Sequence, residues 1–177
     1  MNAPGEVNIE AVLTAREART QRQSQALARH GVPLLSITLV MPGPVKSGLL
    51  PRRIMQSALA AVDARLSRMR WPILTREVLW LPTGPEAIYA INAPEEELKL
   101  ALVELESRHV LGRLWDLDVI GQQGPLSRSR LGIAPRRCLL CDEPAHACAR
   151  SRAHPLPTLL AAIREKVDAF DRNPLAA

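Results

Sequence analysis

Two aspartates, Asp116 and Asp118, have the spacing that most directly suggests chemistry in this sequence. They lie in segment 114–120, where polar and apolar side chains alternate as in a β-strand, so both carboxylates share one face. Two like charges so close repel each other unless a cation lies between them, and Mg²⁺ combines carboxylate ligands with substrate phosphates. The pair therefore predicts a magnesium site for phosphoryl or nucleotidyl transfer, with Gly112 admitting a phosphate to the backbone and Arg113 holding the leaving diphosphate. A solvated sheet face explains the same two aspartates without any chemistry.

Acidic and imidazole side chains precede this motif on a predicted helix. Glu106 and His109 are three residues apart, which makes them neighbours on the helix surface. Glu106 is a candidate further metal ligand, and His109 is a candidate general base for a nucleophilic hydroxyl. Exposed positions near a helix end are the alternative explanation for both.

All three cysteines lie close together between residues 138 and 148. Cys138 and Cys141 have the spacing of half a zinc site, which Cys148 with His154 or His146 would complete tetrahedrally. Reduced cysteines that pack a loop are the alternative. The nearby Arg136, Arg137 and Arg150 are candidates for binding substrate phosphates with or without zinc.

The elements that must position these residues follow from periodicity, capping and turn residues. A helix over 9–30 carries Arg16, Arg19 and Arg22 in a row, which is either a solvated face or a docking site for an anionic partner. The further expected elements are a strand at 33–41, a helix from Ser47 with Pro51 in its first turn, strands at 73–81 and 86–92, a helix from Pro94 to about His109, a strand at 114–120, a hairpin turn at 121–124, a last strand at 125–131, and a helix at 157–171 capped by Thr158.

This order predicts an α+β fold with a βαββαβ, ferredoxin-like (split βαβ) sheet covered by helices. A cysteine-containing loop and a C-terminal helix follow the sheet. We expect a single domain over 1–177, in which helix 9–30 precedes a core at 33–131 and the Cys/Arg loop with its helix occupies 135–171.

Composition restricts the class of protein. The net charge of +5 suggests an anionic partner, whereas an aromatic content of 3% disfavours a stacking platform for nucleic acid. We expect neither nucleic acid nor membrane as a partner, since no apolar run reaches the length of a membrane span. The N-terminus lacks the pattern of a signal peptide, and three closely spaced cysteines suit a reducing compartment, so a cytoplasmic location is expected.

Several of these segments together resemble the holo-citrate lyase synthase (apo-citrate lyase phosphoribosyl-dephospho-CoA transferase) family. The resemblance covers about residues 10–165 and adds Lys46 to the candidate phosphate-binding residues. The segments that carry it are the Arg16/Arg19/Arg22 helix, Pro33-Leu34 through Pro42-Gly43-Pro44-Val45-Lys46, Glu104-Leu105-Glu106 with His109, Gly112-Arg113-Leu114-Trp115-Asp116-Leu117-Asp118-Val119, Pro135-Arg136-Arg137-Cys138-Leu139-Leu140-Cys141, and Cys148-Ala149-Arg150.

The resemblance implies a specific reaction and partners. The family transfers 2′-(5″-triphosphoribosyl)-3′-dephospho-CoA to a serine of the citrate lyase acyl carrier protein (the gamma subunit) and releases diphosphate. It implies that Asp116 and Asp118 are Mg²⁺ ligands, and it leaves zinc at the cysteines undecided. The alternatives are a zinc-containing RNA- or protein-binding module without catalysis, and a related transferase that acts on another carrier protein.

Overall fold

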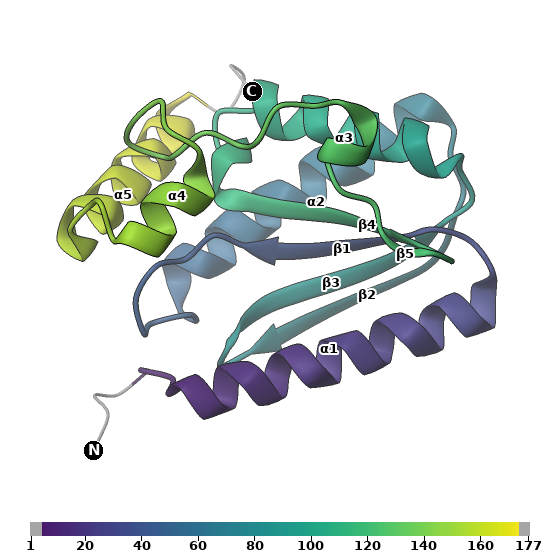
Figure 1. The fold of residues 1–177 in the computed structure, drawn as a ribbon, viewed down its shortest axis with the longest axis horizontal. Helices are drawn as coiled ribbons and strands as arrows, with labels where there is room; N and C mark the ends of the chain where they lie inside the picture. The colour runs from purple at the N-terminus through teal and green to yellow at the C-terminus, as the bar shows by residue number, and fades with distance from the viewer. Residues whose placement is uncertain (1–4, 174–177) are drawn as a thin grey trace. The chain divides into compact units, whose positions relative to one another are not determined.

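The computed structural model describes residues 5–173 (Figure 1). The chain divides into two compact units, Met1–Leu126 and Ser127–Ala177, and each unit is described by itself. The expected single domain over 1–177 stays a prediction. No helix among the described residues is long and apolar enough to cross a membrane.

In its described part, residues 5–126, the first unit contains one five-stranded sheet and three α-helices. The strands lie in the order β2-β3-β1-β4-β5, and every neighbouring pair is antiparallel. This confirms the expected α+β class with an antiparallel sheet. The elements are α1 (Ile9–His30), β1 (Leu34–Leu39), α2 (Leu49–Met69), β2 (Ile73–Leu81), β3 (Gly84–Ile91), α3 (Glu95–Arg108), the 3₁₀ turn η1 (Gly112–Leu114), β4 (Trp115–Gly121) and β5 (Gly124–Pro125).

Helices cover both faces of this sheet. Helix α1 lies along one face, and α2 and α3 lie on the other (Figure 1). Leu34 is fully buried beneath Leu27 of α1, and it shares that cluster with apolar residues of β3 and β4. Because side chains alternate along a strand, the register that pairs Leu34 with Ile120 also places Asp116 and Asp118 on the α1 face.

The outer edge of β4 is held by two side chains of α3. β5 pairs only with Ile120 and Gly121, so strand pairing leaves Leu117 without a partner on that side. The Leu117 N–H donates to a Glu106 carboxylate oxygen at 2.9 Å, and the Lys99 ammonium donates to the Leu117 carbonyl oxygen at 3.0 Å. Glu106 and Lys99 are buried, and they satisfy backbone groups that would otherwise lose hydrogen bonds.

Gly112 permits the tight passage from α3 to β4. A Cβ atom at this position would lie 2.3 Å from the Glu106 carbonyl oxygen, inside the closest approach that such atoms tolerate. The glycine is buried against the helix backbone. The absence of a side chain at Gly112 therefore has a packing reason.

The elements of the second unit differ from those that its sequence predicted. Its elements are the 3₁₀ turn η2 (Ser129–Leu131), α4 (Ala145–Ser151) and α5 (Leu156–Arg172). The last strand predicted at 125–131 was wrong, because β5 ends at Pro125, which has no N–H to donate, and the chain then enters η2. The predicted cap Thr158 was also wrong, because prolines at 155 and 157 start the helix earlier, with Pro155 as the N-cap. Helix α4 was not predicted.

We predict that Gly112→Ala lowers the free energy of unfolding by about 1–3 kcal/mol, because the added methyl group must displace the α3 backbone. Urea denaturation followed by circular dichroism measures this change. An unaltered unfolding midpoint would show that the junction between α3 and β4 is looser than the structure indicates.

Candidate active site

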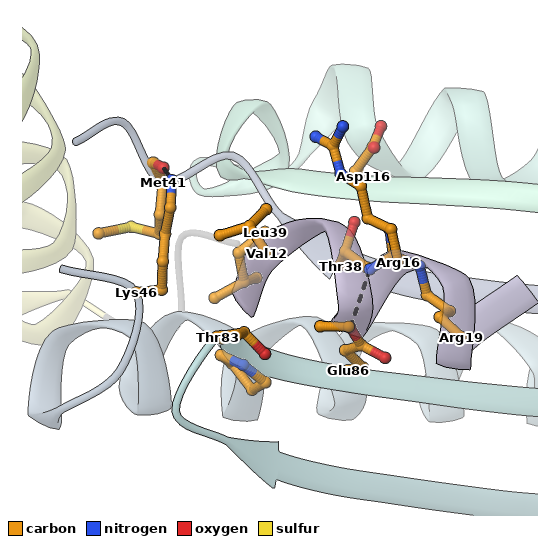
Figure 2. A pocket seen from close by; sticks show the side chains of 13 residues that line it. Val12, Arg16, Arg19, Thr38, Leu39, Met41, Lys46, Thr83, Glu86 and Asp116 are labelled. Carbon is orange, nitrogen blue, oxygen red and sulfur yellow. Dashed lines mark hydrogen bonds and ion pairs between the residues drawn. The ribbon is translucent and has the colours of Figure 1, made fainter. Parts of the chain in front are cut away.

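A cavity of about 230 Å³ lies between α1 and the sheet face that carries Asp116 (Figure 2). Its lining comes from α1, β1, the segment that follows β1, the start of β3, and β4. The lining residues are Val12, Ala15, Arg16, Arg19, Thr38, Leu39, Met41, Lys46, Thr83, Gly84, Pro85, Glu86 and Asp116. Three cations and two carboxylates thus face one small space, which suits an anionic ligand.

Glu86 of β3 is the buried acid of this site, with 4% of its surface exposed. One of its carboxylate oxygens accepts from Arg19 at 2.9 Å, and the other accepts from Arg22 at 2.6 Å. The dashed line in Figure 2 marks the first of these contacts. The pair of arginines compensates for the desolvation of Glu86 and fixes α1 to the sheet.

Lys46 and Arg16 also contribute positive charge to the lining of this cavity. The Lys46 ammonium donates to the Met41 carbonyl oxygen. Burial, and then the nearby positive charge of Arg16, hold the pKa of Lys46 below its ordinary value of 10.5. A bound phosphate would relieve that repulsion, so the two cations favour a phosphate ligand.

Asp116 and Asp118 differ in their surroundings although they share a sheet face. Asp116 lines the cavity, next to Thr38, which pairs with it on the neighbouring strand β1. Asp118 lies outside the lining, with 56% of its side chain exposed and a carboxylate oxygen 3.6 Å from the Lys99 ammonium. That distance exceeds the length of a normal hydrogen bond, so the Lys99 contact leaves Asp118 capacity for other ligands.

His109 and Glu106 lie away from this cavity. The His109 ring packs on Trp115 with ring centroids 4.3 Å apart, and its Nδ1 accepts from the Leu111 N–H at 3.0 Å. Burial lowers the pKa of His109. Since Trp115 is adjacent to Asp116 on an alternating strand, its side chain points to the opposite face. The structure therefore does not bring His109 and Asp116 together.

The candidate phosphate-binding residues are spread over both units. Lys46 lines the cavity, whereas Gly112 and Arg113 lie in η1 and are not among its lining residues. Arg136, Arg137 and Arg150 belong to the second unit, where the Arg137 guanidinium pairs with Asp142 at 2.9 Å.

The four expected zinc ligands do come together in the second unit. The ligand atoms of Cys138, Cys141, Cys148 and His154 all lie within 4.8 Å of one another. His146, the alternative fourth ligand, is exposed and is not part of this group. Among the residues described, this is the one group of three or more such side chains that could hold a metal ion.

The cysteines of this group have very different acidities. Burial opposes ionisation of Cys138, but hydrogen bonds from the backbone of Leu140 and Cys141 lower its pKa to about 6. Burial, followed by contacts with the other two thiols, raises the pKa of Cys148 to about 12. The cluster therefore favours one thiolate, stabilised by backbone N–H groups, among neighbouring thiols.

Comparison with known sequences identifies the family of this chain. A family model described as apo-citrate lyase phosphoribosyl-dephospho-CoA transferase matches residues 7–170. Proteins with that name from Escherichia coli O7:K1 (strain IAI39 / ExPEC) and Shigella boydii serotype 18 are each 43% identical to this chain over 171 residues, which is 94% of it and 93% of each relative. The chain belongs to this family.

For this apo-citrate lyase phosphoribosyl-dephospho-CoA transferase family member, the structure adds site residues that the sequence did not single out. The sequence indicated Arg16 and Arg19 only as members of a row of arginines on helix 9–30. It did not indicate Thr38 or Glu86 as site residues. Glu86 did carry a signal, because it is the one acidic residue of the otherwise apolar segment 84–91. A charge in a buried strand requires a partner, and the arginine row supplies it.

We predict that Glu86→Gln lowers the free energy of unfolding by about 3 kcal/mol, because it leaves two partly buried arginines without their counter-charge. Glu104→Gln is the matched control. Glu104 pairs with Arg65 and Arg108, but its own side chain is 40% exposed, whereas that of Glu86 is 5% exposed. Pairs of a solvated carboxylate are each worth less than about 1 kcal/mol. Equal losses in the two variants, measured by urea denaturation, would contradict the role of Glu86.

We also predict a pH dependence of anion binding in the cavity. Lys46 is positively charged below its lowered pKa, so its attraction for inorganic diphosphate is present at neutral pH and is lost as the pH rises through a value below 10.5. Calorimetric titrations over a pH series should show this loss, and Lys46→Arg should move it to higher pH. Ionisation of diphosphate itself contributes equally to binding by the unchanged protein and by Lys46→Arg. Identical pH profiles of diphosphate binding would therefore exclude Lys46 as the titrating group.

Proposed function

We propose that this protein transfers the phosphoribosyl-dephospho-CoA group to apo-citrate lyase. The donor is 2′-(5″-triphosphoribosyl)-3′-dephospho-CoA, and the acceptor is a serine of the acyl carrier subunit. The serine oxygen attacks the phosphorus that is attached to the ribose, a new P–O bond forms, and the P–O bond to diphosphate breaks. The hydroxyl proton is released, so the products are a phosphodiester and diphosphate.

One observation supports this function above the others. A chain that matches the family over residues 7–170 brings Arg16, Lys46 and Asp116 to one cavity. Cations beside a carboxylate suit a substrate whose phosphates must be held while a metal neutralises their charge. The acceptor hydroxyl comes from the partner, so the protein requires no nucleophile of its own.

The donor set at Asp116 fits the proposed Mg²⁺. Mg²⁺ binds through one or two carboxylates together with water and substrate phosphates, and it does not require an all-protein cage. Asp116 would hold it, with Asp118 as the second carboxylate on the same sheet face. When bound, the ion would neutralise charge on the phosphates and on the departing diphosphate.

The protein's own side chains then have distinct tasks. Arg16 and Lys46 bind phosphate oxygens, and Arg19, fixed by Glu86, defines the wall of the cavity. Glu106 and Lys99 position β4 through the Leu117 backbone. We do not assign the serine proton to His109, because it packs on Trp115, away from Asp116.

The arginines outside the cavity have a further task in this proposal. Arg113, Arg136, Arg137 and Arg150 extend phosphate and partner binding. An acyl carrier protein is acidic, so the net charge of +5 would speed its encounter with this protein. We place the reaction in the cytoplasm, where the closely spaced cysteines would stay reduced.

The same proposal includes the finer description of the fold. β3 lies between β1 and β2 in the sheet, and β1 lies between β3 and β4. Helix α2 connects β1 to β2, and helix α3 connects β3 to β4. This arrangement supports the ferredoxin-like, split βαβ description.

Incubation of the protein with apo-acyl carrier subunit and the triphosphoribosyl donor, with and without Mg²⁺, tests the function. Mass spectrometry should show the carrier gaining the phosphoribosyl-dephospho-CoA group only when Mg²⁺ is present, with one diphosphate released per modified serine. Modification of a different carrier protein alone would favour the related transferase.

We predict that Asp116→Asn reduces the rate of transfer about 100-fold, because the variant loses a charged ligand of a metal ion that supplies several kcal/mol of charge stabilisation. Its unfolding midpoint should remain close to that of the unchanged protein. Asp168→Asn, an exposed position on α5, is the control and should keep full activity. Full activity of Asp116→Asn would remove the metal from the mechanism.

A further inference from the structure

We propose that Cys138, Cys141, Cys148 and His154 form a tetrahedral zinc site that stabilises the second unit. Such a site goes beyond the transfer reaction and does not depend on it. The four residues come from three successive structural segments: a turn, helix α4, and the connection between α4 and α5.

Two of the distances between the ligand atoms are close to those of a zinc tetrahedron. Zinc bonds of about 2.3 Å to sulfur and about 2.05 Å to nitrogen place tetrahedral ligands about 3.8 Å (sulfur to sulfur) and about 3.6 Å (sulfur to nitrogen) apart. In the structure, Cys141 Sγ lies 3.5 Å from Cys148 Sγ and 3.4 Å from His154 Nε2. All four atoms fall within 4.8 Å of one another.

Disulfide chemistry does not explain this arrangement. The three cysteines are free thiols, and the 3.5 Å between Cys141 and Cys148 far exceeds a covalent S–S bond of about 2.05 Å. One disulfide would also leave the third cysteine and His154 without a role. Three sulfur atoms and one imidazole nitrogen are a usual ligand set for structural zinc.

The backbone around Cys138 and Cys141 forms a short hairpin that fixes the positions of both residues. Cys138 N–H donates to the Glu143 carbonyl oxygen at 2.7 Å, and Ala145 N–H donates to the Arg136 carbonyl oxygen at 2.8 Å. Arg137 and Pro144 form an isolated β-bridge between the two arms. This short hairpin holds Cys138 and Cys141 in its tip and leads directly into α4, which carries Cys148.

The second unit also has few buried side chains to stabilise it, which a metal site would offset. Of its described residues, 127–173, only Cys148, Ile163, Val167 and Phe170 are buried. A unit of this size with so few buried side chains gains little from hydrophobic burial, and small units commonly rely on a metal or disulfides. Here the buried Cys148 belongs to the proposed metal site itself.

Metal analysis of the full-length protein, purified under reducing conditions, tests this inference. We expect about one zinc ion per chain, and the same content in His146→Ala, which removes a neighbouring imidazole outside the cluster. Cys141→Ser should lose the zinc. Absence of zinc from the unchanged protein, iron in its place, or a native Cys141–Cys148 disulfide found by mass spectrometry would overturn the proposal.

A second measurement does not depend on whether a cysteine variant folds. Replacement of zinc by Co²⁺ in the unchanged protein should give the thiolate charge-transfer and intense d–d absorption bands of a tetrahedral site. Weak octahedral bands would contradict the proposal. Both experiments measure metal content or metal spectra and not transfer activity. A negative result would therefore overturn the zinc site without affecting the proposed transfer reaction, and a negative transfer assay would leave the zinc site unaffected.

Discussion

The buried ion pairs of Glu86 with Arg19 and Arg22 are the interaction on which the proposed site depends. Through these ion pairs, Arg19 and Arg22 hold α1 against the sheet face that carries Asp116. Nearby, Gln23 of α1 donates to the Ser36 hydroxyl at 3.0 Å, so polar contacts continue along this interface. Without them, the sheet face around Asp116 would be open to solvent, and Arg16 would have no fixed position over it.

The strand that carries the aspartates is held from the opposite layer. Lys99 and Glu106 of α3 cap the Leu117 backbone, and Lys99 also reaches toward Asp118 across the edge of β4. Gly112 allows α3 and β4 to come close enough for these contacts. Sequence analysis predicted Glu106 as a further metal ligand, and in the structure its carboxylate accepts a hydrogen bond from the Leu117 N–H.

Most elements of the first unit could be predicted because their hydrophobic periodicity is strong. Helix α1 was predicted at its observed bounds, and the alternation at 114–120 correctly placed both aspartates on one face. The second unit was harder, since Pro125 and the prolines of α5 move boundaries that periodicity alone suggests. Its short hairpin and α4 have little periodic signal.

The cavity itself was beyond prediction from one sequence. It requires Arg16 of α1, Lys46 of a loop and Asp116 of β4 to meet, and no local pattern encodes a contact over 100 residues. The cysteine group was predictable for the opposite reason. Its ligands lie within 17 positions, Cys138 to His154, so spacing alone limited how they could assemble.

A crystal structure of the protein with the triphosphoribosyl donor and Mg²⁺ tests the central claim most directly. The account predicts that the phosphate chain lies between Arg16 and Lys46 and that the ion touches Asp116. Phosphates bound elsewhere, with this cavity filled only by solvent, would contradict it.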